Sequence, residues 1–139
     1  MGTHKDLAIW QEGINLVQKV YDLTRSFPKE ELFGLSSQIK RCAVSIPSNI
    51  AEGAARNSGN EYIRFLYISL GSLSELETQM EIAKRLKFIG EFEVLDDIEN
   101  LRKKMLNFIK YLKNKRVQGR TYSQSLEPIN SSTHEPVNP

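Results

Sequence analysis

Few residues in this sequence have the types and spacing that enzyme chemistry needs. Its two histidines, His4 and His134, lie near opposite ends of the chain, and the Glu-x-x-His pairs that bind di-iron centres in helical bundles do not occur. Cys42, the one cysteine, lies in an apolar stripe without a neighbouring histidine to activate it, so a buried structural thiol is expected. Cysteine clusters with zinc spacing and glycine-rich phosphate loops are also absent from the sequence. We therefore predict a protein that is not an enzyme and that binds no cofactor or metal.

A polar seam is the most informative arrangement of charged residues. Polar side chains recur three and four residues apart, which places them on one side of a helix, and the seam consists of Gln38, Arg41, Ser45, Asn49, Glu52 and Arg56. The carboxylates Glu52, Glu75 and Glu77, with Arg41 and Arg56 on the seam, fit either a metal or acid–base site or a network of ion pairs between helices or subunits. We favour the network, Glu52 and Glu75 with Arg41 and Arg56, because charges held between helices must be paired.

Basic residues suggest a second kind of chemistry, the neutralisation of nucleic-acid phosphates. The candidate phosphate contacts are Arg41, Arg56, Arg64, Lys84, Arg85 and Lys87. A second candidate surface is the basic half of the last expected helix, residues 102–116. The net charge of +2 is too small to argue for nucleic acid by itself. The alternative interpretation is therefore that these residues form ordinary solvated faces.

Four amphipathic helices are expected to position these groups. Apolar residues spaced three and four apart predict a first helix over residues 7–26, ended by Phe27-Pro28, and a second that follows a turn at 29–34 and includes 38–56. Ser58 and Glu61 have capping-box spacing, so a third helix is expected from Gly59 or Asn60 to about Lys87. A fourth is expected over 91–116. Short connections then give an all-α, up-down-up-down, left-handed four-helix bundle over residues 1–116.

The second helix has two unusual features. Pro47 lies in its interior, and we predict a kink rather than a break because both the apolar and the polar pattern continue across it, with Ser45 and Ser48 bonding to the freed backbone groups. The helix also lacks an ordinary charged solvent face. We infer that it is buried both by its own bundle and by a neighbouring subunit. Gly71-Ser72 in the third helix offers a place where another helix approaches closely.

The remaining features bound the class of protein. The 139 residues suffice for one domain with a core, and residues 117–139, rich in Ser, Asn, Gln and Pro, are expected to form a flexible tail. No apolar run reaches the roughly 18 residues of a membrane span, and no signal peptide is recognised. With one cysteine, the composition fits a reducing cytoplasm.

Several segments resemble a known family. They are residues 38–41 (QIKR), residues 45–53 (SIPSNIAEG), Arg56, Glu61-Tyr62, Phe65-Leu66, Gly71-Ser72 and Glu75-Leu76-Glu77. On these segments, over about residues 6–112, the chain resembles the small four-helix-bundle proteins encoded by intervening sequences in bacterial large-subunit (23S) ribosomal RNA genes. The resemblance implies assembly into a ring, typically a homopentamer. A related protein, the accessory subunit of diversity-generating retroelements, pairs with a reverse transcriptase and binds nucleic acid through a basic surface.

Two functions follow as expectations from the residues and the resemblance together. The first is an oligomeric, non-enzymatic bundle that binds structured RNA or DNA through basic surface residues. The alternative is a scaffold for protein–protein interaction, for example with a polymerase or a ribosome-associated partner.

Overall fold

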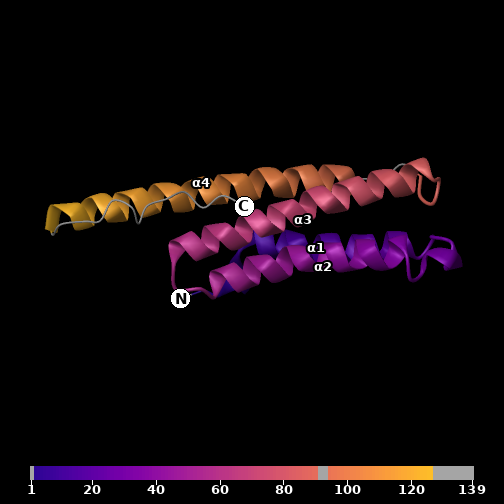
Figure 1. Ribbon diagram of the computed structural model, residues 1–139, viewed down its shortest axis with the longest axis horizontal. Helices are drawn as coiled ribbons and strands as arrows, with labels where there is room; N and C mark the ends of the chain where they lie inside the picture. The colour runs from indigo at the N-terminus through magenta and orange to yellow at the C-terminus, as the bar shows by residue number, and fades with distance from the viewer. Residues whose placement is uncertain (1, 91–93, 127–139) are drawn as a thin grey trace.

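Helices make up the regular structure of this protein. The computed structural model describes residues 2–90 and 94–126, and these ranges contain helices without a strand. Four long helices, α1 (Ala8–Thr24), α2 (Leu35–Ala54), α3 (Gly59–Arg85) and α4 (Val94–Leu126), alternate in direction along a common axis (Figure 1). Two short 3-10 helices, His4–Asp6 and Lys29–Glu31, precede α1 and α2. The expected all-α fold with four helices is confirmed.

Local sequence signals explain where the helices begin and end. The Ser58 side chain accepts a hydrogen bond from the Glu61 backbone nitrogen at 3.2 Å and caps α3, as its spacing predicts. The end of α3 is closed by a hydrogen bond from the Phe88 nitrogen to the Ala83 carbonyl, with the intervening Lys87 at a φ of 65°. Helix α1 lies within the expected range and ends just before the Phe27-Pro28 pair.

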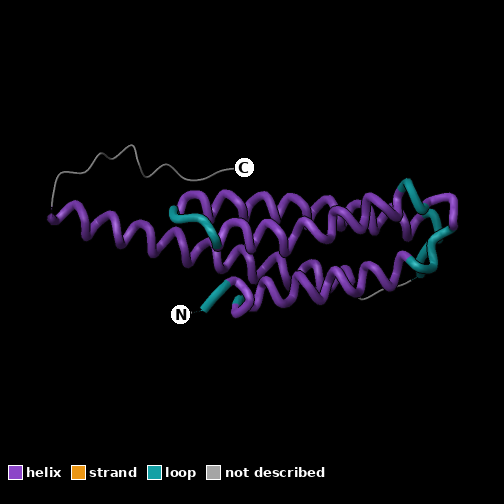
Figure 2. Tube along the Cα trace, turned by 90° about the horizontal axis from the view of Figure 1, so that it is seen from below, coloured by secondary structure: helices purple, strands orange, loops and turns teal. Residues whose placement is uncertain are grey.

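Helix α4 differs most from the expectation. It continues to Leu126, ten residues past Arg116, so residues 117–126 are helical where the sequence analysis placed the start of a flexible tail. Each residue added to an existing helix gains a hydrogen bond without a new nucleation cost, and no proline interrupts the chain before Pro128. The expected start of this helix at 91–93 and the rest of the expected tail, 127–139, lie outside the described residues. Figure 2 shows α4 running well past the other helices.

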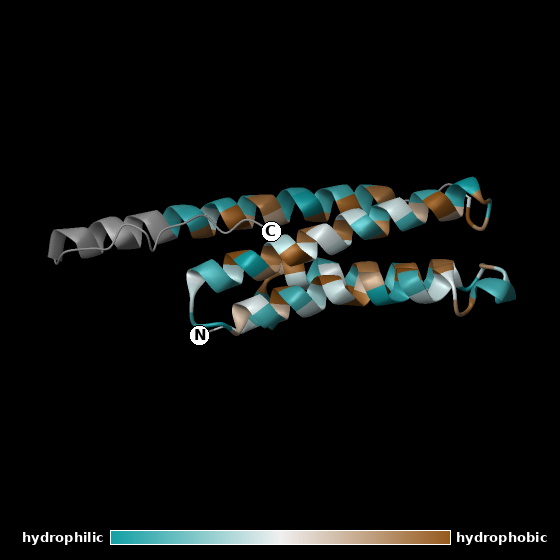
Figure 3. Ribbon diagram, in the orientation of Figure 1, coloured by the Kyte–Doolittle hydropathy of each residue, from teal (hydrophilic) through white to brown (hydrophobic). Residues whose placement is uncertain are grey.

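The core fills the space between the four helices with aliphatic side chains. Hydrophobic and hydrophilic residues alternate along the coloured helices that face the viewer in Figure 3. The fully buried side chains include Leu16, Ile39, Ile46, Leu66, Leu73, Leu76, Met80, Ile98, Leu101 and Met105. Burying one such side chain contributes about 1.5–3 kcal/mol. Helix α1 packs on α2 and α4, and α3 packs on α2 and α4, so each helix has two neighbours.

Helix α2 passes through Pro47 without a break, which excludes two short helices. The proline is buried against Gly13 of α1, where an added Cβ would lie 3.3 Å from the Pro47 Cβ. The expected role of the two serines is wrong. Pro47 has no N–H, so the Ala43 carbonyl lacks its usual helical donor. Neither serine bonds to that carbonyl. Ser45 donates to the Cys42 carbonyl at 2.6 Å, and Ser48 donates to the Val44 carbonyl at 2.8 Å.

Glycine permits one close contact between helices. A Cβ added at Gly53 of α2 would lie 2.8 Å from the Phe65 Cβ and 3.2 Å from the Tyr62 carbonyl oxygen, so only glycine fits against α3 here. Gly71, which the sequence singled out for such an approach, is exposed and has nothing within 4 Å. The close packing therefore lies at the α2–α3 connection, and Gly71 faces outward.

Candidate functional site

The six candidate phosphate contacts are spread along the bundle instead of forming one patch. Arg56 and Arg64 lie beside the α2–α3 connection, residues 84–87 lie at the opposite end of α3, and Arg41 lies within α2. Three of the six pair with a carboxylate of their own chain one helical turn away: Arg56 with Glu52 at 3.1 Å, Arg64 with Glu61 at 3.2 Å and Arg85 with Glu81 at 3.0 Å. These local pairs partly neutralise the arginines, so the six residues do not make a single binding surface.

Phe65 organises the arginines at the α2–α3 connection. The guanidinium groups of Arg56 and Arg64 lie 4.9 and 4.6 Å from the centre of its ring, and each forms a cation–π contact with it. The hydrogen bond from Arg64 lowers the pKa of the Glu61 carboxyl. Tyr62 packs edge-on against Phe108 at 5.6 Å, and burial raises the pKa of its phenol. Phe65 and Tyr62 are thus occupied by packing within the chain.

The polar seam follows the outer edge of α2, and within one chain it does not form the expected network of four charges. Glu52 pairs with Arg56 on its own helix, because residues four apart are neighbours on a helix surface. Glu75 accepts from the Gln79 amide at 3.3 Å. Asn49 donates to the Ser45 carbonyl at 2.8 Å. Gln38 and Arg41 are exposed, and Arg41 has no hydrogen bond or ion pair to the residues that the structure describes.

Cys42 is a buried thiol, as expected. Its sulfur donates a hydrogen bond to the Ser72 carbonyl of α3 at 3.0 Å. Burial, reinforced by the nearby Glu75 carboxylate, raises the pKa of the thiol to about 12. The thiolate needed for nucleophilic or redox chemistry is therefore not formed at neutral pH.

An unsatisfied amide lies next to Glu75. Gln79 is 7% exposed, and its Oε1 atom has no hydrogen-bond partner in the described part of the chain. A buried acceptor without a donor costs about 1–3 kcal/mol. The neighbouring surface, which we call the α2–α3 face, carries small or apolar residues and two charges; it consists of Arg41, Val44, Ser48, Ile68, Gly71 and Glu75. Val44 is 41% and Ile68 37% exposed, so this face is less polar than an ordinary solvent face.

The basic part of α4, residues 100–126, has the most uniform charge in the sequence. Residues 100–126 contain no aspartate or glutamate, and their basic residues are Arg102, Lys103, Lys104, Lys110, Lys113, Lys115, Arg116 and Arg120. Three of these bond to other helices: Arg102 to Glu77 at 2.8 Å, Lys104 to Glu12 at 2.5 Å and Lys113 to the Tyr67 hydroxyl at 2.9 Å. The arginine also pairs with Glu99 at 2.6 Å on its own helix.

Three lysines in this part of α4, which we call the partner-free lysines, remain available to bind a ligand. Lys103, Lys110 and Lys115 are exposed and have no ion pair or hydrogen bond within residues 2–90 and 94–126. They belong to the second candidate surface that the sequence predicts, but the sequence does not separate them from the lysines that are paired. That distinction depends on residues brought close from α1 and α3.

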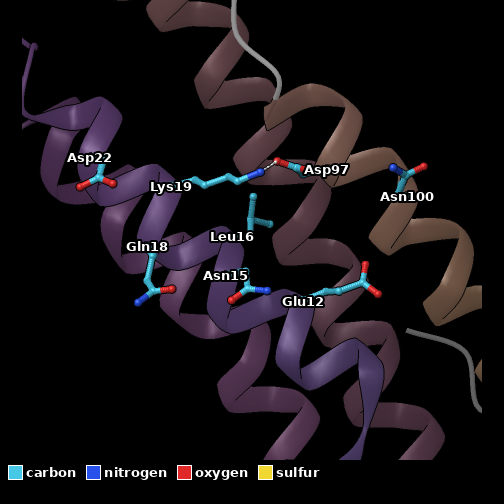
Figure 4. Close-up of a pocket in the computed structure, with 8 residues that line it drawn as sticks. All are labelled: Glu12, Asn15, Leu16, Gln18, Lys19, Asp22, Asp97 and Asn100. Atoms are coloured by element: carbon cyan, nitrogen blue, oxygen red, sulfur yellow. Dashed lines mark hydrogen bonds and ion pairs between the residues drawn. The ribbon is translucent and has the colours of Figure 1, made fainter.

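A polar pocket of about 340 Å³ lies between α1 and α4, and the sequence analysis did not predict it. Figure 4 shows Lys19 reaching across it to Asp97, with 2.7 Å between the ammonium and the carboxylate. The other lining residues are Glu12, Asn15, Leu16, Gln18, Asp22 and Asn100. Their spacing along α1 resembles an ordinary solvated face, so no sequence signal marks the pocket. Its charges are already partly paired, and none of the candidate site residues contributes to it.

The geometry thus defines a class of protein: an all-α, four-helix chain with a long, basic last helix. Among the described residues, no three His, Cys, Asp or Glu side chains are grouped to hold a metal ion. None of their helices is long and apolar enough to cross a membrane. The family of 23S rRNA-intervening sequence proteins matches residues 5–114, a span that takes in α1, α2, α3 and most of α4. The chain belongs to this family. No curated protein matches it.

Proposed function

We propose that this protein is a non-enzymatic bundle that binds RNA or DNA through the basic part of α4, residues 100–126. The observation that carries the proposal is the charge of residues 100–126, which is exclusively basic on a helix that extends past the rest of the bundle (Figure 1). A basic stripe of this kind is the electrostatic footprint of a phosphate-binding surface. The family context of ribosomal RNA genes supports a nucleic-acid ligand.

The partner-free lysines are the best phosphate contacts. Lys103, Lys110 and Lys115 are about 10 and 8 Å apart along α4 at a rise of about 1.5 Å per residue, which spreads their charges over several phosphates. No existing ion pair has to break before they bind. In contrast, three of the arginines must give up a carboxylate partner before they bind a phosphate, so each contributes less binding free energy; these are Arg56, Arg64 and Arg85.

The test is fluorescence anisotropy of a labelled hairpin RNA and a labelled duplex DNA over a range of salt concentrations. Replacing all three lysines by glutamine should weaken binding and reduce the slope of log K against log salt by up to about 2.7 for duplex DNA, at about 0.9 per phosphate contact. The matched control replaces Arg56, Arg64 and Arg85 by glutamine, which removes the same charge. Equal losses in both variants would contradict the assignment to α4. Absence of binding at low salt would overturn the proposal in favour of the protein-scaffold alternative.

We also propose that copies of this chain associate through the α2–α3 face. The supporting observations are the half-exposed Val44 and Ile68, the open space at Gly71, and two groups without a partner among the described residues: the Arg41 guanidinium and the buried Gln79 Oε1. Arg41 of one copy is the complementary donor for Glu75 and Gln79 of the next. A homopentamer is the assembly implied by the family resemblance.

Light scattering after size-exclusion chromatography tests this association. Arg41→Ala should lower the oligomeric mass while leaving the helical circular dichroism of the chain intact. Arg85→Ala, which removes another exposed arginine at the end of the bundle, is the control and should leave the mass unchanged. A wild-type protein that is monomeric at all concentrations would exclude the proposal. An Arg41→Ala protein of unchanged mass but weaker RNA binding would instead make Arg41 a phosphate contact.

A further inference from the structure

A second surface hollow lies beside the basic half of α4. It has a volume of about 360 Å³ and is lined by Leu7, Ala8 and Ile9 from the start of α1 and by Lys104, Asn107 and Phe108 from α4. The walls are mainly apolar, with an ammonium and an amide among them. A flat apolar group with hydrogen-bonding edges therefore matches the hollow better than a charged one.

An aromatic stack continues from this hollow to the surface. The rings of Phe108 and Tyr111 are stacked, with 6.1 Å between their centres and 16° between their planes. Phe108 also makes the edge-to-face contact with the partly buried Tyr62 described above. Tyr111 is 56% exposed, so the outer end of the stack offers a ring to the solvent. The hollow and the exposed ring together form a platform on which a planar group can stack.

The register of α4 places cations on both sides of this platform. Lys104, Asn107, Phe108, Tyr111 and Lys115 are three or four residues apart and share one face of the helix. Lys103 and Lys110 occupy the adjoining face and are among the partner-free lysines. Aromatic rings interleaved with lysines are the combination that single-stranded nucleic-acid sites use, because the rings stack on bases while the lysines follow the phosphates.

We infer that this platform, formed by the hollow beside Phe108 and the exposed ring of Tyr111, binds an unstacked base of a single-stranded RNA or DNA segment. The inference rests on the proposed binding of nucleic acid by α4 and names the form of the ligand. Bases within a duplex are stacked on each other and leave no ring face for Tyr111, whereas the phosphates of a duplex are as accessible to lysine as those of a single strand. The Asn107 amide can both donate to and accept from a base edge.

The test compares an end-labelled single strand with a blunt-ended duplex of similar length that has no unpaired base, bound to wild-type protein and variants at one salt concentration. Tyr111→Ala should weaken single-strand binding by roughly five-fold to 150-fold, the range for loss of one base stack, and leave duplex binding unchanged. Tyr111→Phe keeps the ring and should bind the single strand like the wild type. Leu106→Ala, on another face of α4, removes an apolar side chain of similar exposure (46%) and should leave the affinity for both ligands unchanged.

The outcomes separate this inference from the proposed function. If Tyr111→Ala binds the single strand as the wild type does, or loses both ligands equally, the base site is refuted while nucleic-acid binding by α4 stands. If the wild type binds neither ligand even at low salt, the proposed function fails and the base site fails with it. Because Tyr111 is exposed, thermal melting of the variant should match that of the wild type, which excludes unfolding as the cause of a loss.

Discussion

The contact between Gly53 and α3 makes the sharpest prediction about stability. Replacing glycine by alanine in a helix interior normally stabilises a protein by about 1 kcal/mol, because alanine loses less backbone entropy on folding. At Gly53 the new Cβ would lie 2.8 Å from the Phe65 Cβ and 3.1 Å from the Tyr62 Cδ1. The Phe65 Cβ is fixed to the α3 backbone and cannot rotate away, so α2 and α3 must move apart. Overpacking of this kind costs about 1–3 kcal/mol.

Gly71→Ala provides the matched control. Gly71 also lies within a helix, in α3, but nothing lies within 4 Å of its added Cβ, so this variant keeps the gain in helix propensity without a clash. Gly53 is the second-last residue of α2, so its gain in helix propensity is no larger than that of the mid-helix Gly71, and the clash adds to the difference between the two free energies of unfolding. We expect Gly71→Ala to be stabilised by about 1 kcal/mol and Gly53→Ala to be less stable than it by about 1–3 kcal/mol.

Urea unfolding followed by circular dichroism measures both variants. With an m-value of about 2 kcal/mol/M, the two midpoints should be roughly 0.5–1.5 M apart. The experiment is repeated at several protein concentrations, because Gly71 belongs to the α2–α3 face and a change in association would make its midpoint depend on concentration. A Gly53→Ala protein as stable as Gly71→Ala would refute the close packing of α2 on α3.

Three further predictions concern single side chains. The pKa of the Cys42 thiol is raised from 9.0 to about 12 in the folded protein, so as pH rises this thiol loses its proton first in the unfolded state. The free energy of unfolding should therefore fall between about pH 9 and 12. A Cys42→Ser protein should lack this part of the pH dependence. Ser58→Ala should cost about 1 kcal/mol in thermal or urea unfolding by removing the cap of α3, while Ser58→Gly should cost only a few tenths. Leu66→Ala, at a fully buried site, should cost about 2–5 kcal/mol, and an equally stable variant would contradict the packing of the core.

Local patterns were sufficient to predict much of the fold. Spacing of three and four residues between apolar side chains located the four helices, and the Ser58–Glu61 spacing located the start of α3. The end of α4 was missed because residues 117–126 lack an apolar stripe and owe their helical state to continuation of the helix before them. The serines near Pro47 were misassigned because a hydroxyl has several carbonyls within reach, and the rotamer decides among them.

The candidate site divides along the same line between local and long-range information. Sequence by itself determined that the second half of α4 is basic, that the seam residues share one side of α2, and that Cys42 lies on an apolar stripe, because these are properties of one helix and its 3.6-residue period. Only the tertiary structure decided which basic residues of α4 are paired within the described part of the chain, because their partners Glu12, Tyr67 and Glu77 come from α1 and α3. It also decided that Gly53, and not Gly71, meets a neighbouring helix. Such pairings depend on the rotation and register of packed helices, which the side chains of the whole core set together.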